Sequence, residues 1–351
     1  MGRAGPQTWV ETMSNMAHCE GRWVLVTGAD RSIGSAVAER LAESGAKVTA
    51  LALYNSFDSN GWLDDIAHAR RATIAIERGD VRDPAFMMRL CEGQEVIFHL
   101  AALIAIPHSY AAVQSYVDVN VSGAVNVLEA ARAHRTGRVA MTSTSEVYGT
   151  ARVSPIPESH PLHGQSPYAA SKIAADVMAE AYVRSFDVPA VVLRPFNTYG
   201  PKQSERAVIA STIRQALDPN CEAIDVGNLS TSRDFMFVGD TAAAFLVAGP
   251  HDGLTFGEAY NAGTGHAVTV GEMVDAVRHA AGTNKPVRED AARLRPADPE
   301  VRALLADGTR FSAATGWAAE TSLADGLDQT IAWWRARIGD DKVRAGTGYV
   351  T

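Results

Sequence analysis

Cysteine and metal-binding motifs are scarce in this sequence, and their scarcity excludes two classes of protein. The 351 residues include three cysteines, Cys19, Cys91 and Cys221, and none of them belongs to a Cys-x-x-Cys pair. Three scattered cysteines cannot build a disulfide framework, so a reducing cytoplasm is the expected location. The ten histidines form no His-Glu-x-x-His or similar ligand spacing. We therefore expect no bound metal.

Long basic runs and long apolar runs are also missing. The 40 acidic residues outnumber the 32 basic ones and give a net charge of −8, which argues against nucleic acid or an anionic membrane as the main partner. No segment is apolar over the length needed to cross a bilayer, and residues 1–20 lack the apolar stretch of a signal peptide. The 46% of hydrophobic residues is instead enough to bury a large core.

Short apolar strands alternate with helices along the first 195 residues. This alternation predicts an α/β fold, a Rossmann-type doubly wound parallel sheet with helices on both faces. Strands are expected at 22–27, 47–53, 73–78, 96–100, 137–142 and 190–193, and helices at 35–44, 84–91, 117–134 and 167–186.

The pattern loosens after residue 195 into shorter helices and connections rich in proline and glycine. We predict a dinucleotide-binding domain over 21–195 and a smaller α/β substrate-binding lobe over 196–339, with some segments returning to the first domain. The tails, 1–20 and 340–351, are expected to be loosely held.

Two glycines flank the turn after the first predicted strand. Gly28 follows that strand and Gly34 precedes helical turns, where a dinucleotide fold needs backbone without Cβ so that a pyrophosphate can approach the helix N-terminus. Spacing alone leaves open that both are ordinary turn glycines.

The end of the second strand selects between NAD and NADP in such folds. Leu53-Tyr54-Asn55 stand there, with Asp58 slightly later, and no arginine pair awaits a 2′-phosphate. NAD is therefore favoured, and NADP stays open as the alternative.

Tyr168 and Lys172 are four residues apart in Ser-Pro-Tyr-Ala-Ala-Ser-Lys, so a helix presents both side chains on one face. A neighbouring ammonium favours the phenolate of a tyrosine, which can then take a hydroxyl proton as hydride leaves the same carbon. The alternative is an ordinary helical Tyr and Lys. Upstream, hydroxyl side chains and the carboxylate of Glu146 follow a buried strand within 142–149, at the sheet edge where such folds bind ligands.

These segments together resemble the extended short-chain dehydrogenase family of NAD-dependent epimerases and dehydratases, over residues 22 to 335. Thr27 to Gly34 resembles the family's TGxxGxxG fingerprint, with Arg31 in place of the middle glycine. The resemblance implies NAD or NADP as cofactor and these contacts to it: Gly28, Arg31, Ser32, Ile33, Gly34, Tyr54, Asn55, Asp58, Asp80, Val81, Leu100, Ala101, Ala102, Asn120, Thr142, Tyr168, Lys172 and Pro195.

The resemblance also implies the catalytic and substrate residues. Thr144 matches the residue that hydrogen-bonds the sugar 4-hydroxyl, and Tyr168 and Lys172 match the base and its partner. Ser145-Glu146 resembles the GDP-mannose 4,6-dehydratases and the UDP-glucuronate decarboxylases, whereas epimerases usually lack this glutamate. The implied catalytic residues are Thr144, Ser145, Glu146, Tyr168 and Lys172, and the implied substrate contacts are Thr144, Ser145, Glu146, Asn197, Arg206, Arg233 and Arg295.

Two longer stretches of sequence favour one subgroup of this family. Residues 54–64 and 194–209 are similar to NAD-dependent 4,6-dehydratases that act on nucleotide-linked N-acetylglucosamine in pathways of the legionaminic-acid type. We therefore predict a cytoplasmic nucleotide-sugar 4,6-dehydratase, a lyase, acting on a UDP- or GDP-linked N-acetylglucosamine or related hexose. The alternatives are a UDP-glucuronate decarboxylase, a nucleotide-sugar 4-epimerase and a non-catalytic NAD(P)-binding regulator. Relatives are usually dimers, here expected through residues 111–134 and 167–186.

Overall fold

A seven-stranded parallel sheet forms the centre of the computed structural model, which describes residues 19–290, 303–340 and 343. The strand order is β10-β6-β5-β4-β1-β2-β3, so successive strands are added in one direction from β1 to β3 and in the opposite direction from β4 onward. The strands are β1 (Trp23–Thr27), β2 (Lys47–Leu53), β3 (Ile74–Gly79), β4 (Val96–His99), β5 (Arg138–Thr142), β6 (Ala190–Pro195) and β10 (Ala259–Ala262). This arrangement confirms the predicted Rossmann-type fold.

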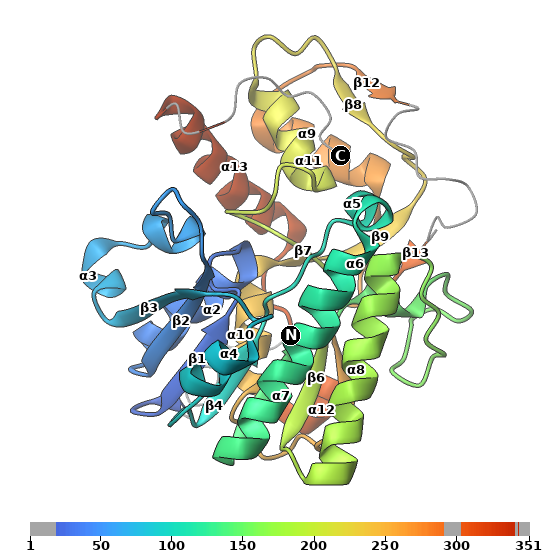
Figure 1. Ribbon diagram of the computed structural model, residues 1–351. Coiled ribbons are helices and arrows are strands. Elements are labelled where there is room, and N and C mark those ends of the chain that lie inside the picture. Colours follow the sequence, from blue (N-terminus) through green and yellow to red (C-terminus); the bar gives the residue numbers. More distant parts are fainter. Residues whose placement is uncertain (1–18, 291–302, 341–342, 344–351) are drawn as a thin grey trace, which may run out of the picture.

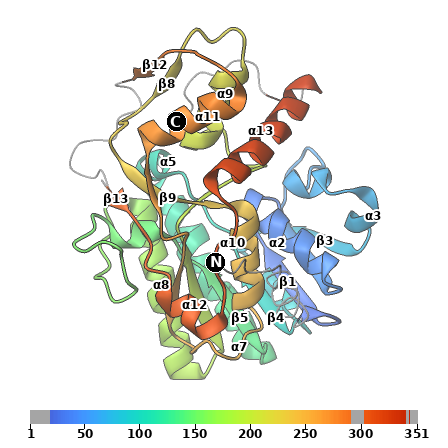
Figure 2. The ribbon, with the colours of Figure 1, turned by 180° about the vertical axis from the view of Figure 1, so that it is seen from behind.

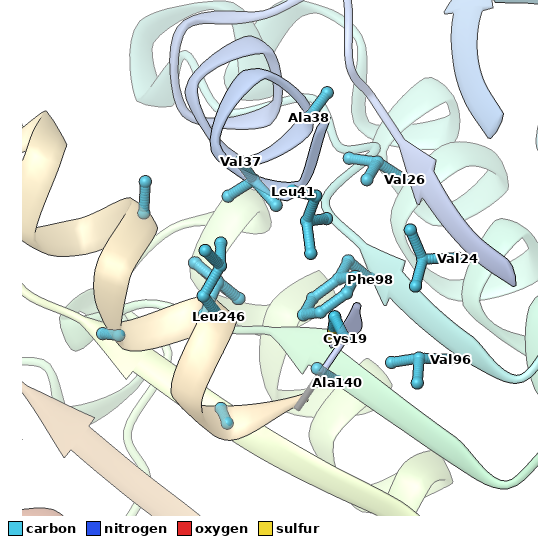
Figure 3. Close-up of a cluster of buried hydrophobic side chains, with 14 of the residues drawn as sticks. Cys19, Val24, Val26, Val37, Ala38, Leu41, Val96, Phe98, Ala140 and Leu246 are labelled. Carbon is cyan, nitrogen blue, oxygen red and sulfur yellow. The ribbon is translucent and has the colours of Figure 1, made fainter. Parts of the chain in front are cut away.

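Helices cover both faces of this sheet, as Figures 1 and 2 show. One face carries α2 (Ser32–Glu43), α10 (Val238–Ala248) and α12 (Thr309–Thr315), and the other carries α4 (Pro84–Leu90), α7 (Gly123–His134) and α8 (Pro167–Phe186). In Figure 3, Val37 and Leu41 of α2 and Leu246 of α10 pack against Val24, Val26 and Phe98 of the strands. Because both faces of the sheet are covered by helices, the side chains on both sides of β1 are buried beyond its first residue, which explains its continuous apolar sequence.

The second half of the chain contributes to both parts of the molecule. Besides β10, α10 and α12, it forms a mixed sheet and a two-stranded sheet covered by helices that share a separate hydrophobic core. The strands are β7 (Asn197–Tyr199), β9 (Ser232–Phe237), β11 (Ala267–Thr269) and β13 (Ala303–Leu304), with β8 (Ile224–Val226) pairing β12 (Val287–Glu289); the helices are α9 (Val208–Leu217), α11 (Val270–Ala281) and α13 (Leu323–Gly339).

Local sequence explains where helices α8 and α11 begin. Ser166 caps α8 by accepting a hydrogen bond from the backbone of Ala169, and Pro167 occupies its first turn. Thr269 and Glu272 form a capping box at the start of α11. The predicted helix 167–186 therefore has the bounds that its sequence indicates.

One predicted helix is wrong in its first third. The stretch expected as a regular helix over 117–134 starts with a π-helical segment, η3 (Val117–Ser122), and becomes α-helical only at Gly123. Asn120 lies in this segment, and its side-chain amide makes two hydrogen bonds with the backbone of Leu103. Oδ1 accepts from the Leu103 N–H (2.8 Å), and Nδ2 donates to the Leu103 carbonyl (3.0 Å). A π-turn re-aims one side chain within a helix, a change that apolar periodicity does not reveal.

Several short elements were not predicted. They are η2 (Gly61–Asp65), α3 (His68–Arg71), α5 (Ile106–Ala111), α6 (Val113–Tyr116) and η4 (Ser145–Tyr148). The predicted tails lie almost entirely outside the described residues. Among the described helices, none combines the length and apolar character that a membrane span requires.

Candidate active site

The turn between β1 and α2 presses against the end of β4. Gly28 adopts φ +67°, and a Cβ there would lie 2.7 Å from the backbone nitrogen of Ala101. A Cβ on Gly34 would overlap the carbonyl oxygen of Gly28. Both positions therefore require glycine for backbone packing. Arg31 has an ordinary extended conformation, and its side chain is 65% exposed, so it does not crowd the loop.

The N-terminus of α2 meets the requirements of an anion site. Its N-cap residue, Arg31, makes no side-chain capping bond, and the following amides of Ser32, Ile33 and Gly34 are the first-turn groups that lack carbonyl partners within a helix. The helix dipole adds positive potential there. The Ser32 hydroxyl donates to the carbonyl of Pro201 (3.1 Å), which ties this turn to the second half of the chain.

Thr27, the first residue of the fingerprint but not among the predicted cofactor contacts, joins the ends of β1 and β4. Its hydroxyl oxygen accepts the backbone N–H groups of Leu100 (3.1 Å) and Ala101 (3.2 Å) and lies 2.9 Å from Nδ1 of His99. Burial and the charge of Lys172 lower the pKa of His99 to about 3. His99 is therefore neutral throughout the physiological range.

The predicted adenine contacts follow β3. Arg82 binds both carboxylate oxygens of Asp80 (Nε 3.0 Å to each, Nη2 2.6 Å to Oδ2), and these hydrogen bonds lower the pKa of Asp80. Val81 is buried against Gly123, where a Cβ would meet the valine side chain. Asn126 donates to the Val81 carbonyl (2.9 Å). The backbone at Asp80 and Val81 is thus firmly held.

The loop after β2 carries the predicted residues Tyr54, Asn55 and Asp58. The Asn55 side chain accepts the N–H groups of Phe57 (3.0 Å) and Ser59 (3.4 Å) and donates to the Ser59 carbonyl (2.8 Å). Tyr54 is 69% exposed. Asp58 pairs with Arg78 at the end of β3, a residue that the sequence analysis missed because it lies twenty positions away.

The predicted catalytic residues converge at the carboxyl ends of β5 and β6. Tyr168 and Lys172 occupy one buried face of α8, and the ammonium of Lys172 donates to the Thr142 carbonyl (2.5 Å). The Thr144 side chain hydrogen-bonds the Tyr168 hydroxyl, and Glu146 lies near enough for its charge to act on the same phenol. Ser145, between them, is buried.

Burial shifts the pKa values of Tyr168 and Lys172 in opposite directions. It raises the pKa of Tyr168, whereas the hydrogen bond from Thr144 lowers it. Burial lowers the pKa of Lys172 to about 8, and the charge of Asp176 works against that change. Both shifts disfavour a charged group in a poorly hydrated site. A bound cation beside the phenol would favour the phenolate.

Asn120, predicted to support the site, reaches α8 from the π-helical segment. Its amide donates to the hydroxyl of Ser171 (2.9 Å), which in turn donates to the carbonyl of Tyr168 (2.7 Å). The π-helical segment therefore connects the backbone at Leu103 to the helix that carries Tyr168 and Lys172, the predicted catalytic pair.

A buried polar network beneath Lys172 was missed by the sequence analysis. Asp176 accepts hydrogen bonds from Ser143 (2.8 Å) and from Nε of Arg194 (3.1 Å) and forms an ion pair with Nη2 of Arg194 (3.0 Å). Arg194 also donates to the Tyr148 hydroxyl (3.0 Å). The only available sequence signal was the position of Asp176, one further turn of α8 after Lys172.

Among the described residues, two buried polar atoms at this edge lack hydrogen-bond partners: Oγ1 of Thr142 and Nδ2 of Asn197. Native proteins rarely leave such atoms unsatisfied, so a ligand is the natural partner for both. Thr142 was predicted to contact the cofactor and Asn197 the substrate. Pro195 ends β6, buried beside Ala262 of β10.

The predicted substrate arginines occupy different surroundings. Arg206 is exposed and close enough to Tyr116 for its charge to act on that phenol, whose ring packs edge-on against Tyr168 (centroids 6.3 Å apart). Arg233 lies on β9 and donates a hydrogen bond to the Ser232 carbonyl (2.8 Å). Arg295 lies outside the described residues.

Comparisons with known proteins show the family to which the chain belongs. Residues 25–330 match the family model described as GDP-mannose 4,6 dehydratase. The UDP-glucose 4-epimerase of Mycolicibacterium smegmatis is 32% identical over 317 residues, which cover 89% of this chain and 98% of that protein. A dTDP-glucose 4,6-dehydratase of an Actinoplanes species is 30% identical over 324 residues, covering 89% and 98%.

A solved structure shares the fold over nearly its whole length. The dTDP-glucose 4,6-dehydratase of Streptomyces venezuelae, solved with NAD bound, is 28% identical, with a TM-score of 0.78, covering 90% of this chain and 98% of that one. Because the family model spans most of the chain and relatives at 30% identity or more align over nearly their full length, this protein belongs to the GDP-mannose 4,6-dehydratase-like family of NAD-dependent epimerases and dehydratases.

Proposed function

We propose that the chain is an NAD-dependent nucleotide-sugar 4,6-dehydratase. The observation that carries this proposal is a carboxylate, Glu146, whose charge acts on the same phenol that Thr144 hydrogen-bonds. Oxidation or epimerisation at C4 needs one proton acceptor, Tyr168. Elimination needs a second base for the C5 proton, and Glu146 is suited to that task.

The described residues fit NAD. The uncapped N-terminus of α2 would take the pyrophosphate, and the unsatisfied hydroxyl of Thr142 offers a hydrogen bond at the sheet edge. The S. venezuelae relative was solved with NAD, which supports the same cofactor here. When bound, NAD would supply the acceptor and donor of hydride.

Tyr168 would take the proton of the sugar 4-hydroxyl on its phenolate oxygen. The ammonium of Lys172, anchored on the Thr142 carbonyl, and the hydroxyl of Thr144 would stabilise that phenolate. The burial of Tyr168 and Lys172 excludes bulk water from the proton transfer.

The ketone formed at C4 would acidify the C5 proton, which Glu146 would remove. The C6 hydroxyl would then leave as water, protonated through Ser145 or through a bound water. The stored hydride would then return to C6 and the proton held by Glu146 would return to C5, so the overall reaction is the redox-neutral loss of one water. Ser145 is buried beside Glu146, which supports its placement at the reacting carbons.

A UDP- or GDP-linked N-acetylglucosamine, or a related hexose, is the substrate we propose. The unsatisfied amide of Asn197 and the exposed guanidinium of Arg206, whose charge acts on the nearby Tyr116, support a nucleotide diphosphate site. Arg233 and Arg295 complete the proposed diphosphate contacts. The resemblance over 54–64 and 194–209 supports the N-acetylglucosamine subtype.

The second candidate is a 4-epimerase, favoured by the similarity to the M. smegmatis enzyme, which carries that name. In that case Glu146 would only orient the sugar. A decarboxylase acting on UDP-glucuronate would share the Thr144 to Glu146 loop, and a non-catalytic NAD-binding regulator would turn over nothing.

Mass spectrometry separates these functions. The purified protein would be incubated with UDP-GlcNAc, GDP-GlcNAc, dTDP-glucose, GDP-mannose and UDP-glucuronate. Loss of one water without net NADH accumulation is expected from one of the first four. An unchanged mass with altered stereochemistry would assign epimerisation, loss of carbon dioxide would assign decarboxylation, and no turnover of any compound would support a regulator. Glu146→Gln retaining full dehydration would remove the mechanism.

A homodimer in the cytoplasm is the proposed state. Exposed apolar side chains lie on the surface shared by α5, α6, η3 and α8, which pack together. They are Tyr110, Val113, Val117, Val177 and Met178. Light scattering of the purified protein tests the dimer, with a monomer mass contradicting it.

A further inference from the structure

The guanidinium of Arg78 holds the loop that follows β2. Its Nη1 donates to the Asp58 carboxylate (2.5 Å), its Nη2 to the Asp58 carbonyl (3.1 Å) and its Nε to Oδ1 of Asn60 (2.8 Å). The Arg78 side chain is 30% exposed, whereas that of Asp58 is 91% exposed. One cation therefore lies beneath the loop, and its paired carboxylate faces solvent.

This pair lies where a dinucleotide fold recognises the adenosine ribose. Arg78 is the register partner of Ala52, one residue before the end of β2. The carboxyl end of that strand is the place where an acidic side chain accepts from the ribose 2′-hydroxyl of NAD and a nearby arginine accommodates the 2′-phosphate of NADP. The backbone N–H of Tyr54 donates to the Gly79 carbonyl (3.2 Å), which closes the loop over the end of β3.

Other cations near the predicted cofactor contacts already have acidic partners close by. Arg31 lies 3.6 Å from Asp30, and Arg82 forms a two-pronged contact with Asp80. Each of these carboxylates is separate from Asp58. Neutralising Asp58 would therefore uncover the charge of Arg78 alone.

We propose that Asp58 and Arg78 together set the preference for NAD over NADP, an inference that rests on the proposed cofactor site. The Asp58 carboxylate favours the ribose 2′-hydroxyl and repels a 2′-phosphate. Arg78 is a phosphate-binding cation that Asp58 neutralises. Its bonds to Asn60 and to the Asp58 carbonyl do not involve the carboxylate, so an Asp58→Asn change exposes the charge without releasing the side chain.

Binding measurements on four proteins test this proposal. Isothermal titration of NAD+ and NADP+ gives the two dissociation constants for the wild type, Asp58→Asn, Arg78→Met and the double variant. Asp58→Asn should lower the ratio of the NADP+ to the NAD+ dissociation constant about tenfold or more, as gain of a charge-assisted bond implies. Adding Arg78→Met should reverse most of that gain.

The matched control is Glu77→Gln, which removes one exposed carboxylate from the neighbouring position of β3 and should leave the ratio unchanged. Circular dichroism and thermal melting establish that each variant is folded. An unchanged ratio in folded Asp58→Asn overturns the proposal, as does a gain that persists in the double variant, which would assign the phosphate contact to another cation such as Arg31.

The outcome also separates this inference from the proposed function. A wild type that binds neither dinucleotide removes the cofactor site itself, and this inference with it. A wild type that binds NAD+ but shows no dependence on Asp58 and Arg78 keeps the proposed function and overturns only the specificity pair.

Discussion

The two halves of the central sheet hold their functional residues by different means. On the side of β1 and β2, the decisive features are backbone ones: Gly28 and Gly34 leave no room for a Cβ, and the first turn of α2 has no side-chain cap. On the side of β5 and β6, helix α8, which carries the proposed catalytic pair, rests on buried side chains, with Asp176 and Arg194 3.0 Å apart.

This difference predicts different tolerance to substitution. The half with β1 and β2 should lose stability when a side chain is added at Gly28 or Gly34, because the added Cβ would overlap neighbouring backbone atoms. The half with β5 and β6 should lose stability when one buried charge is removed, because its partner stays buried without compensation. In the exposed loop around Asp58, by contrast, substitutions should leave the free energy of unfolding nearly unchanged and alter only the preference between NAD and NADP.

The largest effect is expected on turnover from Tyr168→Phe. Loss of the phenol removes the proposed proton acceptor, and turnover should fall by about 10²–10⁴-fold, the usual contribution of a general base. NAD+ affinity measured by titration should change little. Tyr110→Phe, on an exposed tyrosine of α5, is the control. Near-normal turnover in Tyr168→Phe would move the base elsewhere.

Asp176→Asn should cause the largest loss of stability. The variant keeps the shape of the side chain but leaves Arg194 buried without its anion, which should lower the free energy of unfolding by about 3–5 kcal/mol. Urea denaturation measures this. Ser143→Ala removes one hydrogen bond to the same carboxylate and should cost only about 1 kcal/mol. Equal losses in the two variants would contradict a buried ion pair.

Gly28→Ala tests the backbone argument on the opposite half of the sheet. A methyl group at φ +67° and 2.7 Å from the Ala101 nitrogen must strain the turn, at a cost of about 1–3 kcal/mol in unfolding free energy. NAD+ affinity should fall as well, because the turn carries the start of α2. Gly93→Ala, at φ +73° with no atom near its Cβ, separates strain from overlap, and an equal loss there would refute the overlap.

The pH dependence of activity should report on Lys172. Because burial lowers its pKa to about 8, the ammonium is present below that pH and is lost as the pH rises through it. Of its charged and titratable neighbours, Asp176 holds the pKa up, and His99, with a pKa of about 3, stays neutral. The ratio kcat/KM should therefore fall about tenfold per pH unit above this point, and a profile flat to pH 10 would contradict the assignment.

The smallest effect concerns stability in the Asp58 loop. Because its carboxylate is almost fully exposed, Asp58→Asn should change the free energy of unfolding by less than about 0.5 kcal/mol. Thermal melting beside the binding titrations checks this. A loss as large as that of Asp176→Asn would show that the loop is structural, and the contrast between the two regions would disappear.

Local patterns predicted most of the fold because they are properties of neighbouring residues. The apolar runs of β1, β2 and β6 and the four-residue spacing of Tyr168 and Lys172 specify strands and a helix face without reference to the rest of the chain. The turn glycines and the capped start of α8 belong to the same class of signal.

What only the tertiary structure decided are the contacts between residues far apart in sequence. Arg78 meets Asp58 across twenty residues and Arg194 meets Asp176 across eighteen, and β10 completes a sheet that began at Trp23. A single arginine or aspartate belongs to no repeating pattern, so the sequence does not indicate which residue it will pair with. The sequence therefore determined the strands of the central sheet, the long helices beside it and the shared helix face of Tyr168 and Lys172, whereas packing decided which charges neutralise each other, because that depends on which elements the fold brings side by side.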